Sequence, residues 1–300
     1  MARRKKKSPP IFLTVIVIII AVIYSYFGGF EGALGDSRVV EVVDGTIELH
    51  VIDVGQADAI LIRGEGGNIL FDAGDLDTKD ELKSYLDGIG VDEIEYAVFT
   101  HPHADHIGGA DVIVQSFDVN NVIMPVTDDS DTPTTAVYKR LISALENDET
   151  VNVIAAESGA EYSVGDVKMK LLAPNSDNYS ELNNYSVVVR VDFGATSFML
   201  TGDAEDISEA EMLEKYPQSE FKCNFYKAAH HGAAESNTAE FLSAVSPEII
   251  AISCGEGNSY GHPHAEAMER FEATGAEIYR TDLLGTLVFV SDGTTITKAE

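Results

Sequence analysis

The sequence has 300 residues and is 45% hydrophobic, enough for the core of one large α/β domain or two small ones, which excludes disorder as the default for most of the chain. The formal net charge is −30 at pH 7: five of the 20 basic side chains lie in residues 3–7, whereas all 50 acidic side chains follow Phe30. Phosphate affinity comes largely from Lys and Arg displacing counterions, so this composition disfavours tight, sequence-independent binding of duplex DNA.

The first 30 residues are predicted to form a basic cytoplasmic start and a single transmembrane anchor. Residues 11–27 are an apolar run interrupted only by Thr14 and Ser25, close to the shortest stretch that spans a ~30 Å hydrocarbon core. The basic flank should stay in the cytoplasm, so the remaining chain is expected on the extracytoplasmic side of the cell membrane. A cleaved signal peptide, with a small-residue site at 33–35, is the alternative.

Residues 31–37 are rich in glycine and small side chains and are interpreted as a linker to a folded domain at 38–300. In that domain, strand-like and helix-like periodicities alternate, which favours two sheets covered by helices in one α/β domain. The expected strands are 46–54, 59–63, 68–72, 94–100, 167–172, 185–193, 197–201, 249–253 and 286–290. The expected helices are 78–87, 134–146, 205–216 and 263–274, the last opening with a proline.

Cys223 and Cys254 are the only cysteines. Two cysteines are too few for a disulfide framework, and their spacing matches no zinc motif. One disulfide and two buried free thiols both remain open.

Seven of the eight histidines fall in three clusters, at 101, 103 and 106, at 230 and 231, and at 262 and 264. His101 and His103 are two residues apart at a strand end, so they can point to one side and bind one ion, while Asp105 and His106 turn toward a second. Gly108 and Gly109 follow, where a tight turn into a helix is expected. This spacing predicts a metal site; a solvated histidine-rich loop is the alternative.

The motif His101-x-His103-x-Asp105-His106, preceded by the apolar strand and by residues 71–75, resembles that of the metallo-β-lactamase superfamily. Within it, residues 53–59, 201–203 and 230–232 resemble the hydrolase domain of the ComEC-type competence proteins of DNA uptake. The resemblance covers about residues 45–290. It implies an αββα sandwich with a metal centre at one edge of the two sheets.

Carried over by motif, the resemblance implies two divalent metal ions, zinc or manganese. His101 and His103 would hold the first ion, Asp105 and His106 the second. Asp203 would bridge both, and His231 would complete the second site, with His230 as the alternative.

Many superfamily members have a third histidine for the first ion, but this sequence has none between 106 and 230. The corresponding segment, 182–186, contains Asn184. The first ion would then be held more weakly, or through an asparagine or water. We place Asn184 and His230 beside the ligands or against the substrate.

Two further residues are assigned from their surroundings. Asp72 is expected to orient a ligand imidazole, since ligating histidines usually donate their other N–H to a carboxylate or carbonyl; closing a turn with Gly74 is its alternative role. His262 lies where the family places a substrate-facing loop, and could contact a phosphate or protonate a leaving group. Asp105 and His262 are the predicted catalytic residues, whereas His264 is expected to face solvent.

The expected reaction is hydrolysis by metal-activated water, with a phosphodiester as substrate, either single-stranded DNA or a cell-envelope component. A β-lactam or thioester hydrolase of the same fold and a non-catalytic metal-binding module are the alternatives. ComEC-type proteins carry this domain beside a polytopic channel, whereas this chain has one apolar span. Any channel would therefore be a separate partner that the sequence does not identify.

Overall fold

The computed structural model describes residues 42–127 and 133–299. The predicted anchor and linker lie outside these residues. Among the helices of the described part, none combines the length and the apolar character that crossing a membrane requires. The described residues form one compact unit.

This unit contains two mixed β-sheets. The first has the spatial order β15 (Ile296–Lys298), β14 (Leu287–Ser291), β1 (Ile47–Val51), β2 (Ile60–Gly64), β3 (Gly67–Phe71), β4 (Glu93–Val98), β5 (Asp118–Met124) and β6 (Asn152–Ala155). The second has the order β13 (Glu277–Arg280), β12 (Ile249–Ile252), β11 (Phe225–Lys227), β10 (Thr196–Leu200), β9 (Val189–Phe193), β8 (Val167–Leu171) and β7 (Glu161–Val164).

Each sheet is antiparallel in one half and parallel in the other. Strands β3 to β6 and β10 to β13 are parallel and need helical crossovers. The crossovers carry α2 (Lys79–Gly88), α3 (Ala104–Ile107), α4 (Ala110–Ser116) and α5 (Ala136–Asn147) on the first sheet, and α6 (Asp206–Lys215), α7 (Ala239–Val245) and α8 (Ala265–Thr274) on the second. Shorter elements are α9 (Thr281–Leu284) and the 3-10 turns at Leu182–Tyr185, Gln218–Glu220 and Ala229–Gly232.

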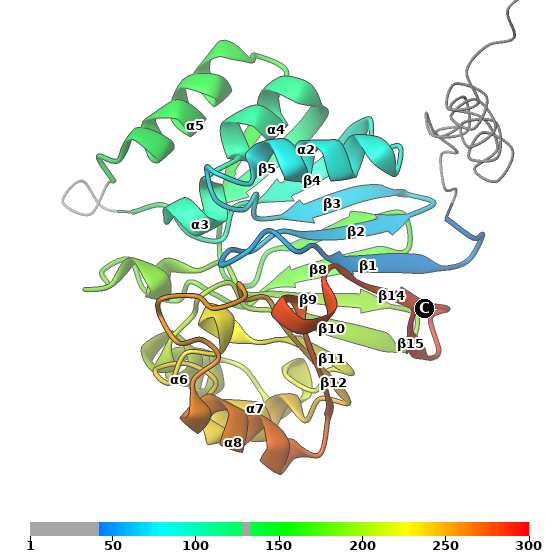
Figure 1. Ribbon diagram of the computed structural model, residues 1–300, viewed down its shortest axis with the longest axis vertical. Helices are drawn as coiled ribbons and strands as arrows, with labels where there is room; N and C mark the ends of the chain where they lie inside the picture. Colours follow the sequence, from blue (N-terminus) through cyan, green and yellow to red (C-terminus); the bar gives the residue numbers. More distant parts are fainter. Residues whose placement is uncertain (1–41, 128–132, 300) are drawn as a thin grey trace, which may run out of the picture. The chain divides into compact units, whose positions relative to one another are not determined.

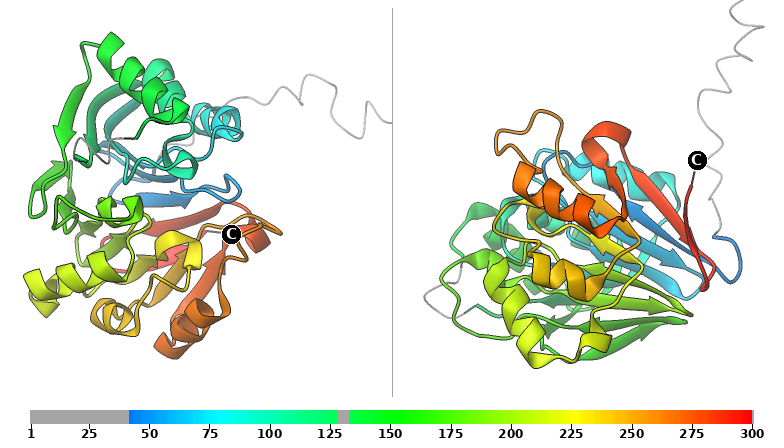
Figure 2. Two further views of the ribbon diagram at one scale, coloured as in Figure 1. Left: turned by 90° about the vertical axis from the view of Figure 1, so that its left-hand side faces the viewer. Right: turned by 90° about the horizontal axis from the view of Figure 1, so that it is seen from below.

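The sheets pack face to face, with helices on both outer surfaces (Figure 1). Along β2, Ile60 and Ile62 point into the core between the sheets, whereas Leu61 points outward to the helices. Leu82 and Leu86, one helical turn apart on α2, fill the outer layer above Leu61. A third cluster places α6, α7 and α8 against the second sheet, and both views of Figure 2 show this second helical layer. These layers are the expected αββα sandwich.

Most expected elements agree with the structure to within two residues, but the strand expected at 46–54 ends at Val51, three residues early, and the following elements also differ. The expected strand at 185–193 begins only at Val189, because Leu182–Tyr185 forms a 3-10 turn. Helix α8 begins at Ala265, so Pro263 precedes it and His264 is its N-terminal capping residue. Several elements were not anticipated: β5, β6, β7, β11, β13, β15, α3, α7 and α9.

Candidate metal centre

The predicted site residues lie in loops at one edge of the two sheets. Strands β1, β3 and β4 run in one direction, and Asp58, Asp72 and the 101–106 segment follow their carboxyl ends. In the second sheet, Asp203 follows β10, and residues 230–231 follow the parallel strand β11. Parallel strands deliver the loops at their carboxyl ends to a single edge, so segments far apart in the sequence meet there.

The 101–106 segment leads from β4 into the short helix α3. His101 and His106 are buried, at 1% and 0% exposure, and His103 caps the helix. Gly108 has ordinary helical dihedral angles, but a Cβ there would lie 2.2 Å from the backbone nitrogen of Leu76. The glycine is therefore required by close packing of α3 against the loop after β3, and not by the tight turn expected from the sequence.

Four side chains from three loops converge at this edge. The ligand atoms of Asp105, His106, Asp203 and His231 all lie within 4.8 Å of one another. His106 Nε2 is 3.2 Å from Asp203 Oδ2, and His231 Nε2 is 3.4 Å from Asp105 Oδ2. Nitrogen and carboxylate ligands bind zinc at about 2.0–2.2 Å, so four donors within this span fit around one divalent ion.

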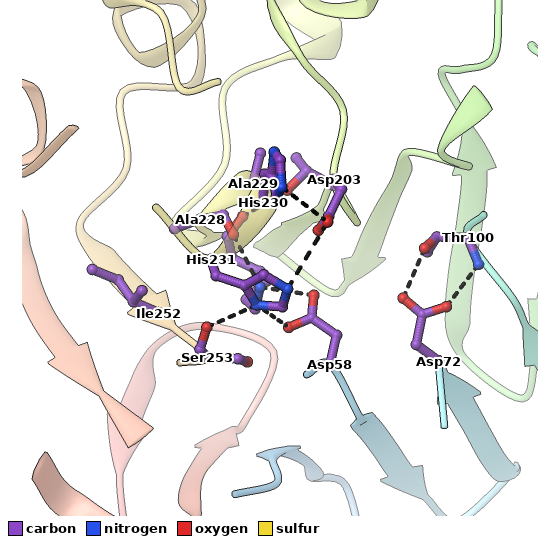
Figure 3. Close-up of polar contacts among 12 residues, drawn as sticks. Asp58, Asp72, Thr100, Asp203, Ala228, Ala229, His230, His231, Ile252 and Ser253 are labelled. Atoms are coloured by element: carbon purple, nitrogen blue, oxygen red, sulfur yellow. Dashed lines mark hydrogen bonds and ion pairs between the residues drawn. The ribbon is translucent and has the colours of Figure 1, made fainter. Parts of the chain in front are cut away.

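A second pair of donors lies beside this group. His101 Nε2 is 3.0 Å from His103 Nδ1 and 3.9 Å from Asp203 Oδ2. Asp203 Oδ2 thus lies within 4 Å of nitrogens of both His101 and His106, which is the placement that a bridging carboxylate needs. Figure 3 shows Asp203 directed toward His230 and His231.

Buried polar atoms without partners mark the same spot. His106 Nε2, His231 Nε2 and Asp203 Oδ1 are buried, and none has a hydrogen-bond partner within the described residues. Such atoms are rare in folded proteins because an unpaired buried donor or acceptor is costly. Their convergence fits a bound cation that accepts all three as ligands.

The charges at the site also call for a cation. Burial by itself lowers the pKa of His106, but the carboxylates of Asp203, Asp72 and Asp105 outweigh it and hold the pKa well above its ordinary value. Burial raises the pKa of Asp203, yet the neighbouring His106 and His231 reverse this and keep it well below its usual range. The carboxylates thus favour a positive charge at this position, which either a proton on His106 or a divalent ion can supply.

Asp72 orients the imidazole of His106 by contacting Nδ1, the ring nitrogen that does not face the candidate metal centre. Its carboxylate accepts hydrogen bonds from the backbone N–H and the hydroxyl of Thr100, each at 2.7 Å, and from His106 Nδ1 at 2.7 Å. With Nδ1 engaged as a donor, His106 presents an unprotonated Nε2 to the centre when neutral. Figure 3 shows the contacts between Asp72 and Thr100.

His230 and His231 occupy a strained turn. Both have left-handed backbone angles, with φ of 48° and 53°, which non-glycine residues adopt only when surroundings hold them there. The buried Asn237 does so, because its amide accepts from the N–H of Ala229 at 2.9 Å and donates to the carbonyl of Ala229 at 3.0 Å. The turn therefore directs two adjacent imidazoles into the site.

The two imidazoles have different surroundings. His231 Nδ1 donates to the carbonyl of Ser253 at 3.0 Å, so Nε2 faces Asp105. His230 is partly exposed, with Nε2 3.7 Å from Asp203 and Nδ1 3.5 Å from Glu205. His231 belongs to the compact group of donors, whereas His230 lies at its margin.

The 3-10 turn Leu182–Tyr185 does not direct the side chain of Asn184 toward the candidate metal centre. Its amide nitrogen donates to Glu205 Oε2 at 3.2 Å, and its oxygen accepts from the backbone N–H of Ser208 at 3.1 Å. The neighbouring Asn183 lines the cavity, and its Oδ1 is buried without a hydrogen-bond partner among the described residues. Asn183 is therefore the better-placed amide oxygen.

A cavity of about 340 Å³ opens over the centre and is lined by His103, Asp105, Asp203, His230 and His262. Burial, and then the neighbouring His231 and His230, lower the pKa of His262 to about 4. At neutral pH this imidazole is uncharged, which favours contact with a phosphate over protonation of a leaving group. His264 instead accepts from the N–H of Ala234 at 3.0 Å and donates to the Tyr260 carbonyl at 3.1 Å.

Beneath His231 lies a buried ion pair that sequence reasoning missed. Lys227 Nζ donates to Asp58 Oδ2 at 2.9 Å and to the carbonyl of Ala228 at 2.9 Å, and both charged side chains are almost completely buried. Asp58 Oδ1 is 3.5 Å from His231 Nδ1. Figure 3 shows Asp58 directed toward His231. Asp58 lies in the 53–59 motif, which was the one available signal.

Comparison with known proteins agrees with this arrangement. The sequence profile of the Metallo-beta-lactamase superfamily matches residues 52–172, which include Asp72 and the 101–106 segment. The metallo-beta-lactamase fold protein YhfI from Bacillus subtilis superposes with a TM-score of 0.54 over 82% of this chain and 99% of that chain, at 12% identity, a likeness of fold alone. Residues 52–172 thus carry the sequence signature of a metallo-beta-lactamase domain, and hydrolases of this fold are metal-dependent.

Its curated homologues include ComEC-like competence proteins. The chain is 27% identical to ComE operon protein 3 of Bacillus subtilis (strain 168) over 81% of its own length and 33% of that protein. It is 28% identical to competence protein ComA of Neisseria gonorrhoeae over 80% of its own length and 31% of that protein. The chain thus spans about a third of the length of these relatives.

Proposed function

We propose that this chain is a metal-dependent phosphodiesterase that uses two divalent ions, zinc or manganese. The observation that carries the proposal is the convergence of Asp203 and His231 on Asp105 and His106, with three buried ligand atoms that no protein group satisfies within the described residues. A closed structural site of four ligands would not need the adjoining pair His101 and His103, nor the cavity above.

When bound, divalent ions supply an activated water and polarise the attacked phosphoryl group. The protein's own part is to orient the donors. Asp72 fixes the ring of His106, the Ser253 carbonyl fixes the ring of His231, and Asp203 lies between the two groups of histidines. Asp105, in the first turn of α3, completes the inner face of the cavity.

The substrate class is argued from the site and from the relatives. Divalent ions held by the carboxylates and imidazoles of the centre would attract an anionic phosphodiester, and imidazoles over the cavity could donate hydrogen bonds to it. Similarity to competence proteins favours single-stranded DNA, and a cell-envelope phosphodiester fits the same chemistry. The net charge of −30 opposes broad contact with a polyanion, so recognition should be local to the reacting phosphate.

The location follows from the sequence. Residues 1–30 would anchor the chain once in the cell membrane, with the basic residues 3–7 inside and the catalytic domain on the extracytoplasmic side.

Hydrolysis of bis-p-nitrophenyl phosphate and of single-stranded DNA by the metal-loaded, full-length chain tests the proposal. The Asp203→Asn variant should lose about a hundredfold or more in rate, because it removes the carboxylate between the two groups of histidines. Asp206→Asn, an exposed aspartate three residues away, is the matched control and should behave as wild type. Equal rates for wild type and Asp203→Asn on every phosphodiester would overturn the proposal, and hydrolysis of nitrocefin or a thioester alone would favour the alternative hydrolases.

A further inference from the structure

His262 is held in place on several sides at the mouth of the cavity. Asn258 clamps its backbone, accepting from its N–H at 3.0 Å and donating to its carbonyl at 2.7 Å. The ring stacks with those of His231 and Tyr260, with interplanar angles of 25° and 21°. The ring orientation is thus set before any substrate binds.

Gln56 decides which ring nitrogen of His262 carries the proton. Its Oε1 accepts from the backbone N–H of Gly255 at 3.0 Å, and that N–H can only donate. The other end of the amide must therefore be the NH₂ group, and it lies 3.1 Å from His262 Nδ1. Nδ1 must accept this hydrogen bond, so the proton of the neutral ring resides on Nε2.

The remaining nitrogen is available to a ligand. No hydrogen bond within the described residues engages His262 Nε2, while the ring lines the cavity together with Asp203 and His230. Gln56 lines the same cavity, and lies in the 53–59 motif, of which the metal centre accounts only for Asp58.

We propose that Gln56 holds His262 in the neutral Nε2–H form, and that this N–H donates a hydrogen bond to an anionic phosphoryl oxygen of the substrate. The inference rests on the proposed phosphodiesterase function for the identity of the ligand. It makes His262 a catalytic residue that binds the phosphoryl group, and Gln56 a positioning residue. The departing oxygen would not take its proton from His262.

The tautomer is tested by nitrogen NMR of the full-length chain, labelled with ¹⁵N-histidine and loaded with diamagnetic Zn²⁺. The His262 signals are assigned by their loss in His262→Gln. Wild type should show a bare Nδ1 and a protonated Nε2 between pH 6 and 8. In Gln56→Glu, a carboxylate oxygen faces Nδ1 and should bring a proton onto it, whereas the exposed control Gln115→Glu should change nothing. A protonated Nδ1 in wild type, or a Gln56→Glu spectrum identical to wild type, would overturn the assignment.

The contact with phosphate is tested by binding of inorganic phosphate, which needs no turnover. His262→Ala should weaken binding by roughly tenfold, the size of a lost hydrogen bond to a charged group. His262→Gln, whose amide can place a donor near the position of Nε2, should stay within about threefold of wild type. Equal weakening in both variants, or no weakening in either, would refute the donor role even if the chain hydrolyses phosphodiesters.

The rate tests separate this role from acid catalysis. Bis-p-nitrophenyl phosphate has a good leaving group, whereas DNA releases a poor one that needs a proton. A donor to the phosphoryl oxygen predicts the same fold-loss in His262→Ala for both substrates. A much larger loss with DNA would show that His262 protonates the leaving group and would overturn the inference. If wild type hydrolyses neither substrate, the proposed function fails, while the NMR and phosphate-binding results still decide the role of His262.

Discussion

Replacing Lys227 by methionine should destabilise the protein far more than a typical lysine substitution. The Lys227 and Asp58 side chains are 0% and 2% exposed, and their charged atoms are 2.9 Å apart. Removing one partner of such a pair leaves a buried, unpaired charge, which costs about 3–5 kcal/mol. The cost should be at the upper end of this range because Asp58 Oδ1 already lacks a hydrogen-bond partner within the described residues.

Urea denaturation of the metal-free chain measures this loss directly. Lys83→Met is the matched control, because Lys83 pairs with Asp87 at 2.6 Å but the two side chains are 37% and 50% exposed. That surface pair should contribute at most about 1 kcal/mol. The double variant Asp58→Asn/Lys227→Met should lose less than the sum of the two single variants, since the unpaired charge is absent. A Lys227→Met loss as small as that of Lys83→Met would refute the argument that this pair is buried and mutually dependent.

Three further predictions follow from the same geometry. Asp72→Asn should weaken metal binding by about 10–100-fold, measured by competition with a chelator, because the amide can no longer hold His106 with Nδ1 as donor; unchanged affinity would remove Asp72 from the site. Burial raises the pKa of Cys223 to about 11 and of Cys254 to about 12. Neither thiol should therefore react with a thiol reagent at pH 8 until urea is added. A thiol that reacts rapidly without urea would contradict the buried arrangement. The pKa of His262 is lowered to about 4, so the imidazole stays neutral when the pH falls from 8 to 5. The loss of rate on the acidic side of the pH–rate profile should therefore persist in His262→Gln. If this loss of rate disappears in the variant, protonation of His262 causes it.

Local patterns were sufficient to predict the strands that flank the metal motif. Residues 94–100 and 68–72 combine apolar runs with flanking turn signals, and the structure places β4 and β3 there. Short strands carry too little periodicity to be recognised, and β11 has only three residues. The strand expected at 185–193 was drawn too long because Leu182–Tyr185 forms a 3-10 turn. Val187 and Val188 lie before β9 but are still buried in the two hydrophobic cores that flank the second sheet, so their apolar pattern resembles that of a strand.

The candidate site, like the fold, has one part that local sequence patterns predict and another part that they do not. The 101–106 motif is local, so its spacing alone predicted a metal-binding role. The supporting residues are defined by contacts between distant segments, and Lys227 meets Asp58 across 169 positions. A lysine at the end of a strand ordinarily indicates solvent exposure, so no sequence pattern marked Lys227 as buried. Asn184 was chosen over Asn183 on sequence alone, and only the orientation of the two amides in space distinguishes them.

The most direct test of the central claim is the content of divalent metal per chain in wild type and in Asp203→Ala, measured on the full-length protein after equilibration with zinc or manganese. Convergence of the distant loops predicts two ions per chain in wild type and a clear loss from both positions in the variant, because Asp203 lies within 4 Å of nitrogens in both groups of histidines. Equal metal content in the two proteins would contradict the account, since the 101–106 segment would then bind metal without the loop after β10.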